Sequence, residues 1–203
     1  MAETETLNNN ALVSYDELAR YLDITNDDDN VIDELTALIN RISKSMETYC
    51  DREFYIQEHT QTYKGTGTNT LPLRQYPITA VSGVWSSSSR TWDSDTLVAA
   101  DDYYNNDDSI VWYESYFPIY SYETIQVIYT AGLFSTTATV PADLKLACMK
   151  EVSRAYKHID DIGVTTRSEN GGVDTWGTLL AMSQEFLPET AQILNRYLKR
   201  RLF

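Results

Sequence analysis

Apolar residues recur at helical spacing in two stretches near the start of the chain. Ser14 and Glu17 stand three positions apart as a capping box, which predicts a short helix through Leu22. The acidic run at 27–29 can cap a second helix over about 30–49, because carboxylates suit the positive end of a helix dipole. Its apolar residues share one stripe: Ile32, Leu35, Ile39, Ile42, Met46 and Tyr49. This stripe is too short to indicate a coiled coil, so packing inside the subunit is favoured over pairing with a partner helix.

Short β-forming runs replace the helical spacing between residues 54 and 130. The Gly-Thr-Gly-Thr-Asn sequence at 65–69 has the composition of a turn and predicts a hairpin after a first strand within 54–63. Further strands are expected at 71–73, 80–85, 96–100, 110–113 and 124–130. Because no helical pattern intervenes, we expect a small antiparallel sheet or an open barrel.

Helical periodicity returns after Pro141, a residue that suits the first turn of a helix. The apolar stripe there consists of Leu144, Cys148, Val152, Ala155 and Ile159. Residues 160–186 lack any such pattern and predict a long loop, which at that length is typically functional or mobile. A last amphipathic stretch has its stripe at Leu187, Ala191, Leu194, Leu198 and Leu202.

These patterns together predict an α+β fold, mainly a helical bundle with an inserted small antiparallel β-sheet and a C-terminal helical arm. The expected organisation is a flexible acidic start at 1–11, then a helical core over 12–159 with the β insertion at about 54–130. The long loop at 160–186 and the basic arm at 187–203 follow.

Composition adds information about partners. The 203 residues, 42% of them hydrophobic, are enough to bury one sizeable core. Thirty Asp and Glu against sixteen Lys and Arg give a net charge of -14, the wrong sign for binding nucleic acid or an anionic membrane. No apolar run is long enough to span a bilayer and no secretory signal opens the sequence, so we expect a soluble chain whose partners are proteins.

The C-terminal stretch differs in charge from the rest. Residues 189–203 have four cationic side chains against one carboxylate, a net charge of +3. A helix this short is marginal alone, so its apolar stripe must be buried, either on a partner or in the core of the subunit. We favour docking on a partner, with core packing as the alternative.

No catalytic or metal-binding pattern is present. His59 and His158 have no ligand at a metal-binding spacing, and Cys50 and Cys148 form no CxxC pair and are expected to be buried thiols. The chain also lacks a phosphate-binding loop, a nucleophile elbow and an HExxH motif. A glycosidase carboxylate pair is defined by its separation in space, which a sequence does not give. We therefore predict no enzyme activity, no cofactor and no metal.

Aromatic residues suggest a second hypothesis, because fifteen Tyr and four Trp could supply a platform for carbohydrate binding. Those in or beside the β region are Trp85, Trp92, Tyr103, Tyr104, Trp112, Tyr113, Tyr116 and Tyr120. Aromatics in the core or at a protein interface explain the same residues. A carbohydrate-binding or receptor-binding module therefore remains the alternative.

The order of elements and several short motifs resemble the head-to-tail connector (adaptor, head-completion) family of tailed bacteriophages. The motifs lie at 12–22, 49–54, 71–78, 129–132, 140–145 and 167–172, so the resemblance covers about 12–201. The run Tyr-Thr-Ala-Gly at 129–132, followed by Val-Pro-Ala-Asp-Leu-Lys at 140–145, is the most specific. The acidic start, the segment 86–118 and the basic end depart from the family pattern.

This resemblance implies a structural virion protein that assembles in the host cytoplasm as a twelve-fold homo-oligomeric ring in the virion neck. Such a ring binds the portal, extends the channel through which DNA passes without specific binding, and offers an attachment surface to the tail or the next neck protein. Candidate portal-binding residues are Leu194, Arg196, Leu198, Lys199, Arg200, Arg201, Leu202 and Phe203. Candidates for a lumen-facing or tail-facing loop are Arg167, Ser168, Glu169, Asn170, Gly171, Gly172 and Trp176.

Overall fold

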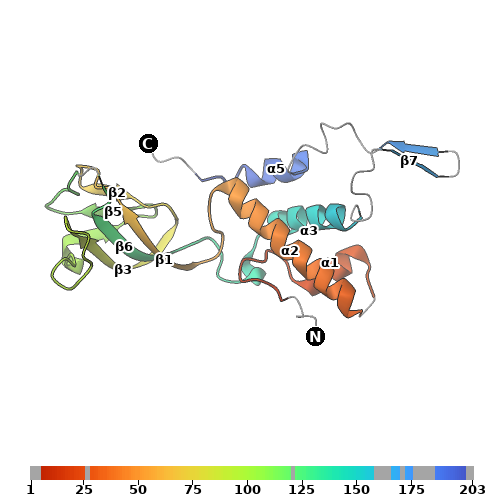
Figure 1. The fold of residues 1–203 in the computed structure, drawn as a ribbon, viewed down its shortest axis with the longest axis horizontal. Coiled ribbons are helices and arrows are strands. Elements are labelled where there is room, and N and C mark those ends of the chain that lie inside the picture. The colour runs from red at the N-terminus through yellow and green to blue at the C-terminus, as the bar shows by residue number, and fades with distance from the viewer. Residues whose placement is uncertain are drawn as a thin grey trace. The chain divides into compact units, whose positions relative to one another are not determined.

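The computed structural model describes residues 6–25, 28–119, 122–157, 166–169, 172–175 and 186–199. The chain divides into two compact units (Figure 1). The helical unit combines Met1–Asp51 with Thr137–Lys199, and the described part of the β unit is the continuous stretch Arg52–Thr136. The predicted α+β class is confirmed, although the β insertion is a compact unit of its own.

Four α-helices and a 3-10 turn are described in the helical unit: α1 Tyr15–Leu22, α2 Asp29–Cys50, η2 Thr137–Thr139, α3 Ala142–Lys157 and α5 Pro188–Leu194. Both ends of the Ser14 and Glu17 capping box are formed, and the Asp28 carboxylate accepts the Asn30 N–H at 3.0 Å. Helices α2 and α3 pack on each other, and both contact α1 and α5 (Figure 1). The predicted starts of α1 and α2 are therefore confirmed by their caps.

Helix α2 buries a wider arc than its apolar stripe predicts. Asn40, Ser43 and Glu47 are buried beside that stripe because the start of the chain lies against them. The backbone N–H of Asn8 donates to Asn40 Oδ1 at 2.8 Å, and that of Leu12 donates to Ser43 Oγ at 3.1 Å. The described part of the predicted flexible start, residues 6–11, is therefore fixed to α2 by hydrogen bonds.

The β unit contains two three-stranded antiparallel sheets, with strand orders β1-β6-β3 and β2-β5-β4. The strands are β1 Gln57–Tyr63, β2 Thr70–Pro72, β3 Ile78–Ser86, β4 Tyr103–Asn105, β5 Ser109–Trp112 and β6 Ile125–Ala131, with a 3-10 turn η1 at Ala100–Asp102. Every second residue of β6 is buried, as expected for a strand with one face on the core. Residues of both sheets contribute to one hydrophobic cluster.

The predicted hairpin around 65–69 is wrong, because β1 pairs with β6 and β2 pairs with β5. The glycines allow a close backbone approach instead. The Gly67 N–H donates to the Phe117 carbonyl at 2.8 Å, and a Cβ on Gly65 would lie 1.9 Å from the Pro118 carbonyl oxygen. Turn composition identified a special backbone position, but not the strands that it separates.

The segment 96–100 forms no strand; it has one bridge, between Leu97 and Trp85, and runs into η1. Strand β4 was not predicted from periodicity, because three polar or aromatic residues in a row show no alternation. It exists through its pairing with β5, in which Tyr103 lies opposite Trp112.

Part of the predicted long loop at 160–186 is regular. Strands β7 Thr166–Glu169 and β8 Gly172–Thr175 pair antiparallel, with Thr166 opposite Thr175. The expectation of a patternless loop is therefore wrong for these eight positions. A two-stranded pair this short has too few residues to give a clear period in the sequence.

Candidate interaction surfaces

Histidine offers no reactive centre among the described residues. His59 is buried in the β unit, where its ring lies 5.4 Å from that of Tyr129 and its Nδ1 lies 3.7 Å from Glu53 Oε2. His158 lies outside the described residues. Within the described part of the chain, no three His, Cys, Asp or Glu side chains are grouped as metal ligands. No helix in that part is both long and apolar enough to cross a bilayer.

The prediction of two buried thiols is confirmed for Cys50 and Cys148. Burial raises the pKa of Cys148 to about 12, although a contact with Ser43 Oγ at 3.9 Å acts in the opposite direction. The nucleophile is the thiolate, so such a thiol is unreactive near neutral pH. Cys50 Sγ donates to the Leu194 carbonyl at 3.6 Å. This thiol therefore has a structural role, in the contact between α2 and α5.

A tyrosine pair in the β unit is also held in a structural role. The Tyr63 and Tyr129 hydroxyls both donate to Gln61 Oε1, at 2.5 and 2.9 Å. Each hydroxyl accepts a backbone N–H at 3.1 Å, from Arg74 and Gln75 respectively. Burial raises the pKa of both phenols. These hydroxyls fix the chain between β2 and β3 to the main sheet.

The C-terminal segment packs on the helical unit over its described residues. Leu194 is fully buried, and Phe186 lies edge-on against Tyr49 with ring centroids 5.5 Å apart. The Leu187 N–H at the start of α5 donates to the buried Glu151 carboxylate at 2.7 Å. The alternative of core packing is therefore correct for Leu194, for which the expectation of a separate arm is wrong, whereas Leu198 is exposed and Leu202 lies outside the described residues.

Polar contacts continue past the end of α5. Arg196 Nη1 lies 3.4 Å from Asp143 Oδ2, and Lys199 Nζ lies 3.4 Å from Asp51 Oδ2. The Lys199 N–H also donates to the Cys50 carbonyl at 2.9 Å. These contacts attach the segment to the ends of α2 and α3.

The described candidate portal-binding residues thus fall into three groups. Leu194 is buried; Arg196 and Leu198 are exposed, with 70% of the Arg196 side chain accessible; and Lys199 is half-buried. Four candidates lie outside the described residues: Arg200, Arg201, Leu202 and Phe203. Their role in portal binding stays a prediction.

The candidate loop residues are partly described. Arg167, Ser168 and Glu169 lie on β7, and Gly172 opens β8 opposite Glu169. Asn170, Gly171 and Trp176 lie outside the described residues.

The aromatic residues of the β unit do not form one platform. Tyr103 and Trp112 pack against the hydrophobic cluster, and the Trp112 and Phe117 rings lie 5.2 Å apart. The exposed aromatics are instead Tyr104, Tyr113, Tyr116 and Tyr122, while Tyr120 lies outside the described residues. Trp85, Trp92 and Trp112 are half-buried, so the most exposed aromatic rings among the described residues of the β unit are tyrosines.

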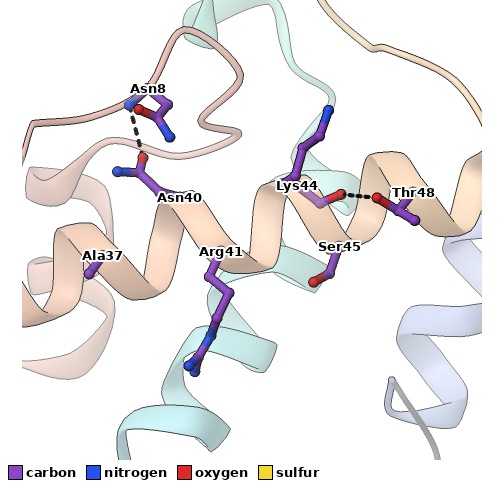
Figure 2. A pocket seen from close by; sticks show the side chains of 7 residues that line it. All are labelled: Asn8, Ala37, Asn40, Arg41, Lys44, Ser45 and Thr48. Carbon is purple, nitrogen blue, oxygen red and sulfur yellow. Dashed lines mark hydrogen bonds between the residues drawn. The ribbon is translucent and has the colours of Figure 1, made fainter.

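A shallow cationic surface lies along α2, and we call it the α2 hollow (Figure 2). It measures about 520 Å³ and is lined by Asn8, Ala37, Asn40, Arg41, Lys44, Ser45 and Thr48. Figure 2 shows the Arg41 and Lys44 side chains reaching away from the helix in opposite directions, with Ser45 on the side of Arg41. The two cations are exposed, whereas Asn40 is held down by its hydrogen bond with Asn8.

A second hollow, of opposite charge, lies on the β unit, and we call it the tyrosine hollow. It measures about 630 Å³ and is lined by Asp101, Asp102, Trp112, Tyr113, Glu114 and Ser115. The Tyr113 N–H donates to the Asp102 carbonyl at 2.8 Å, which fixes η1 against the end of β5. At the edge of this hollow, the centroid of the Tyr104 ring lies 5.1 Å from that of the Tyr113 ring.

Neither hollow was predicted from the sequence. Arg41 and Lys44 are the only cationic residues between Arg20 and Arg52. Their position indicates a local positive surface, but an analysis of apolar periodicity does not consider charge. The carboxylates of the tyrosine hollow come from two separate stretches, which only the pairing of β4 with β5 brings together. That grouping has no local signal.

The fold is similar to those of solved neck and virion structures. A chain of "Virion of native gene transfer agent (GTA) particle" matches with a TM-score of 0.63 and 13% identity, covering 99% of this chain and 96% of that one. A chain of "Neck of empty GTA particle computed with C6 symmetry" matches with a TM-score of 0.61 and 14% identity, covering 98% and 94%. A chain of "Neck of native GTA particle computed with C12 symmetry" matches at 0.56 and 15%, with the same coverage.

Sequence comparison extends over the same length. No curated protein sequence matches the chain. The family model described as "Head completion protein" matches residues 11–200, which include both units. The expected resemblance is therefore confirmed, and the chain belongs to the head completion protein family, a family of phage head-to-tail structural proteins.

Proposed function

We propose that this protein forms a homo-oligomeric, twelve-fold ring in the neck of a phage-like virion. In this role it binds the portal, extends the DNA channel and offers a surface to the tail or the next neck protein. It acts as a structural adaptor and has no catalytic function. The ring is assembled in the host cytoplasm.

The observation that carries the proposal is the family match over 11–200 together with a shared fold that covers nearly the whole length of GTA neck chains. A match of this extent includes both the helical unit and the β unit. Two of those neck structures were computed with C6 and C12 symmetry, which supports a ring with a multiple of six subunits.

Portal binding is assigned to the C-terminal end of the chain. Its sequence Arg-Arg-Leu-Phe at 200–203 combines two cations with two large apolar side chains. The preceding residues are fixed to α2 and α3, so the helical unit supplies a firm base for this end. A basic, apolar peptide of this kind suits an acidic surface that has an apolar groove.

Charge supports passive passage of DNA. Each phosphate that a Lys or Arg neutralises strengthens binding, so a channel that must release a genome quickly should have few cations. A chain with a net charge of -14 meets this requirement.

Electron microscopy of the protein mixed with the portal of the same phage tests the proposal. We expect a twelve-fold ring seated on the portal. The double variant Arg200→Glu/Arg201→Glu should lose portal binding without any change in its unfolding midpoint. Arg20→Glu/Lys64→Glu is the matched control, because it makes the same change of net charge on α1 and after β1. A protein that forms no ring and does not bind the portal would contradict the proposal.

A further inference from the structure

We propose that the tyrosine hollow of one copy is the docking surface for the α2 hollow of a second copy. This inference rests on the proposed ring and specifies one contact between its subunits. The two surfaces belong to different units of the chain and differ in charge.

Exposed aromatic side chains mark the β-unit side of this contact. Tyr113 lines the hollow and is 59% exposed, and Tyr104, whose ring centroid lies 5.1 Å from that of Tyr113, is 41% exposed. Apolar side chains gathered on a surface in this way indicate a protein interface, and tyrosine is enriched at such interfaces. Because the Tyr104 and Tyr113 rings already rest on each other, their order costs little conformational entropy on binding.

The carboxylates of the tyrosine hollow identify the kind of partner. Asp101, Asp102 and Glu114 are exposed, and none of them forms an ion pair with another described residue. A partner that fits must therefore present cations beside a surface that tolerates aromatic rings. A second aromatic or acidic surface would leave these charges unmatched.

The α2 hollow has this chemistry. Arg41 is exposed and forms no ion pair with another described residue, and Lys44 is 62% exposed despite its pairing with Glu47. The small side chains of Ala37 and Ser45 leave room for rings to approach the helix. An Arg guanidinium can lie over a tyrosine ring while a Lys ammonium pairs with carboxylates, so the two cations match the two components of the tyrosine hollow.

The contact is heterologous, since each copy uses one surface to bind and the other to be bound. Head-to-tail contacts of this kind generate rings when the rotation closes. A self-complementary contact would instead stop at a dimer, which a ring in the neck does not allow.

Charge reversal on each side tests the contact. The acidified variant is Arg41→Glu/Lys44→Glu, and the basified variant is Asp101→Lys/Asp102→Lys/Glu114→Lys. Like charges then face each other in either variant alone, so we expect each to lose ring formation on the portal and to associate more than about tenfold more weakly in sedimentation. Mixed in equal amounts, the two variants should form rings again, because each altered surface then meets its complement.

A second measurement detects the contact in the unaltered protein. In a mixture of ¹⁴N-labelled and ¹⁵N-labelled chains, a carbodiimide should join Lys44 to Asp101, Asp102 or Glu114 of the other isotope. The charge control is Arg20→Glu/Lys64→Glu, which should form normal rings and keep the cross-link. Unchanged rings in the acidified and basified variants, or no mixed-isotope cross-link in wild-type rings, would overturn this contact and leave the proposed function intact. Absence of both rings and portal binding in the wild type would instead refute the proposed function.

Discussion

The two units of the chain are stabilised in different ways. The β unit is one continuous stretch in which backbone ladders join neighbouring strands, as in the seven paired positions of β1 and β6. The helical unit combines two stretches that are far apart in the chain, and apart from the Lys199 to Cys50 backbone bond its described long-range polar contacts mostly use side chains such as Glu151 and Asp143. In a helix the backbone N–H and C=O groups bond to one another, so helices are joined to each other mainly by side chains. In a sheet the same backbone groups bond to the neighbouring strand, so the backbone itself joins the strands.

Because of this difference, the stability of the helical unit depends on the packing of the C-terminal segment. Leu194 is buried in a unit whose other helices lie far away in the sequence, and Cys50 contacts it across 144 positions. Closing such a loop costs entropy that only packing and anchors can offset. The segment therefore both completes the helical unit and leads to the proposed portal-binding end.

The largest effect is expected when the chain is truncated after Leu187, which removes α5. Loss of a buried leucine costs about 2 to 5 kcal/mol, and the contacts of Arg196 and Lys199 are lost with it. Ellipticity at 222 nm reports on the helical unit, since all described α-helices lie there. The unfolding midpoint of the helical unit, followed by this signal, should fall sharply in the truncated chain.

Truncation after Lys199 is the matched control for this experiment. It removes Arg200 to Phe203 and retains every described contact of the segment. The free energy of unfolding should therefore stay within about 0.5 kcal/mol of that of the wild type. An unchanged midpoint after the longer truncation would show that the segment is an independent arm after all.

A smaller effect, confined to the other unit, is expected for Ile110→Ala. Ile110 is fully buried on β5 in the hydrophobic cluster, so the cavity should cost about 2 to 5 kcal/mol in the β unit. Three of the four tryptophans, Trp85, Trp92 and Trp112, lie in that unit, so in a Trp176→Phe background tryptophan fluorescence follows its unfolding. The fluorescence midpoint should fall while the ellipticity midpoint stays nearly constant. If both midpoints fell together, the two units would unfold as one and the distinction between them would be lost.

The smallest effect is a pH dependence in the ion pair between α1 and α3. Lys145 Nζ donates to Glu17 Oε1 at 2.6 Å; partial burial acts to raise the pKa of Glu17, but bonds and charge from Lys145 and the Ser14 N–H outweigh it and lower that pKa. A depressed folded-state pKa stabilises the unit above the unfolded value of about 4.3, and the benefit is lost as pH falls through the folded value. Glu17→Gln should therefore lower the helical midpoint at pH 7 and flatten its decline between about pH 5 and 3.

Glu58→Gln provides the comparison, because it removes an exposed carboxylate from β1 in the other unit. It should leave the pH profile of the ellipticity midpoint unchanged. An identical pH profile for Glu17→Gln and the wild type would show that the Glu17–Lys145 pair does not contribute to acid unfolding.

Local sequence was sufficient for the starts of the helices but not for every end, since α5 stops at Leu194 although the predicted stripe continued to Leu202. The Ser14 capping box, the Asp28 cap and the position of Pro141 predicted where α1, α2 and α3 begin, because caps satisfy backbone groups within a few residues. Strand β6 was also predicted almost to its ends, since one buried face gives a period of two.

Strand pairing was beyond local prediction. Turn residues at 65–69 suggested a hairpin, yet β1, which begins at Gln57, pairs with β6, which begins at Ile125. Strand β4 and the β7–β8 pair exist through their partners and have no period of their own. A ladder depends on which backbone lies alongside, and short strands do not encode that choice locally.

The sequence by itself determined the helix starts, the α+β class, the net charge of -14, the buried thiols and the resemblance to a head completion protein. Tertiary structure alone decided that Leu194 is core, and that Asp101 and Glu114 share a surface with Tyr113. The physical reason is range. Caps, periodicity and charge act within a few residues, whereas burial and surface grouping depend on contacts between segments that the chain keeps far apart.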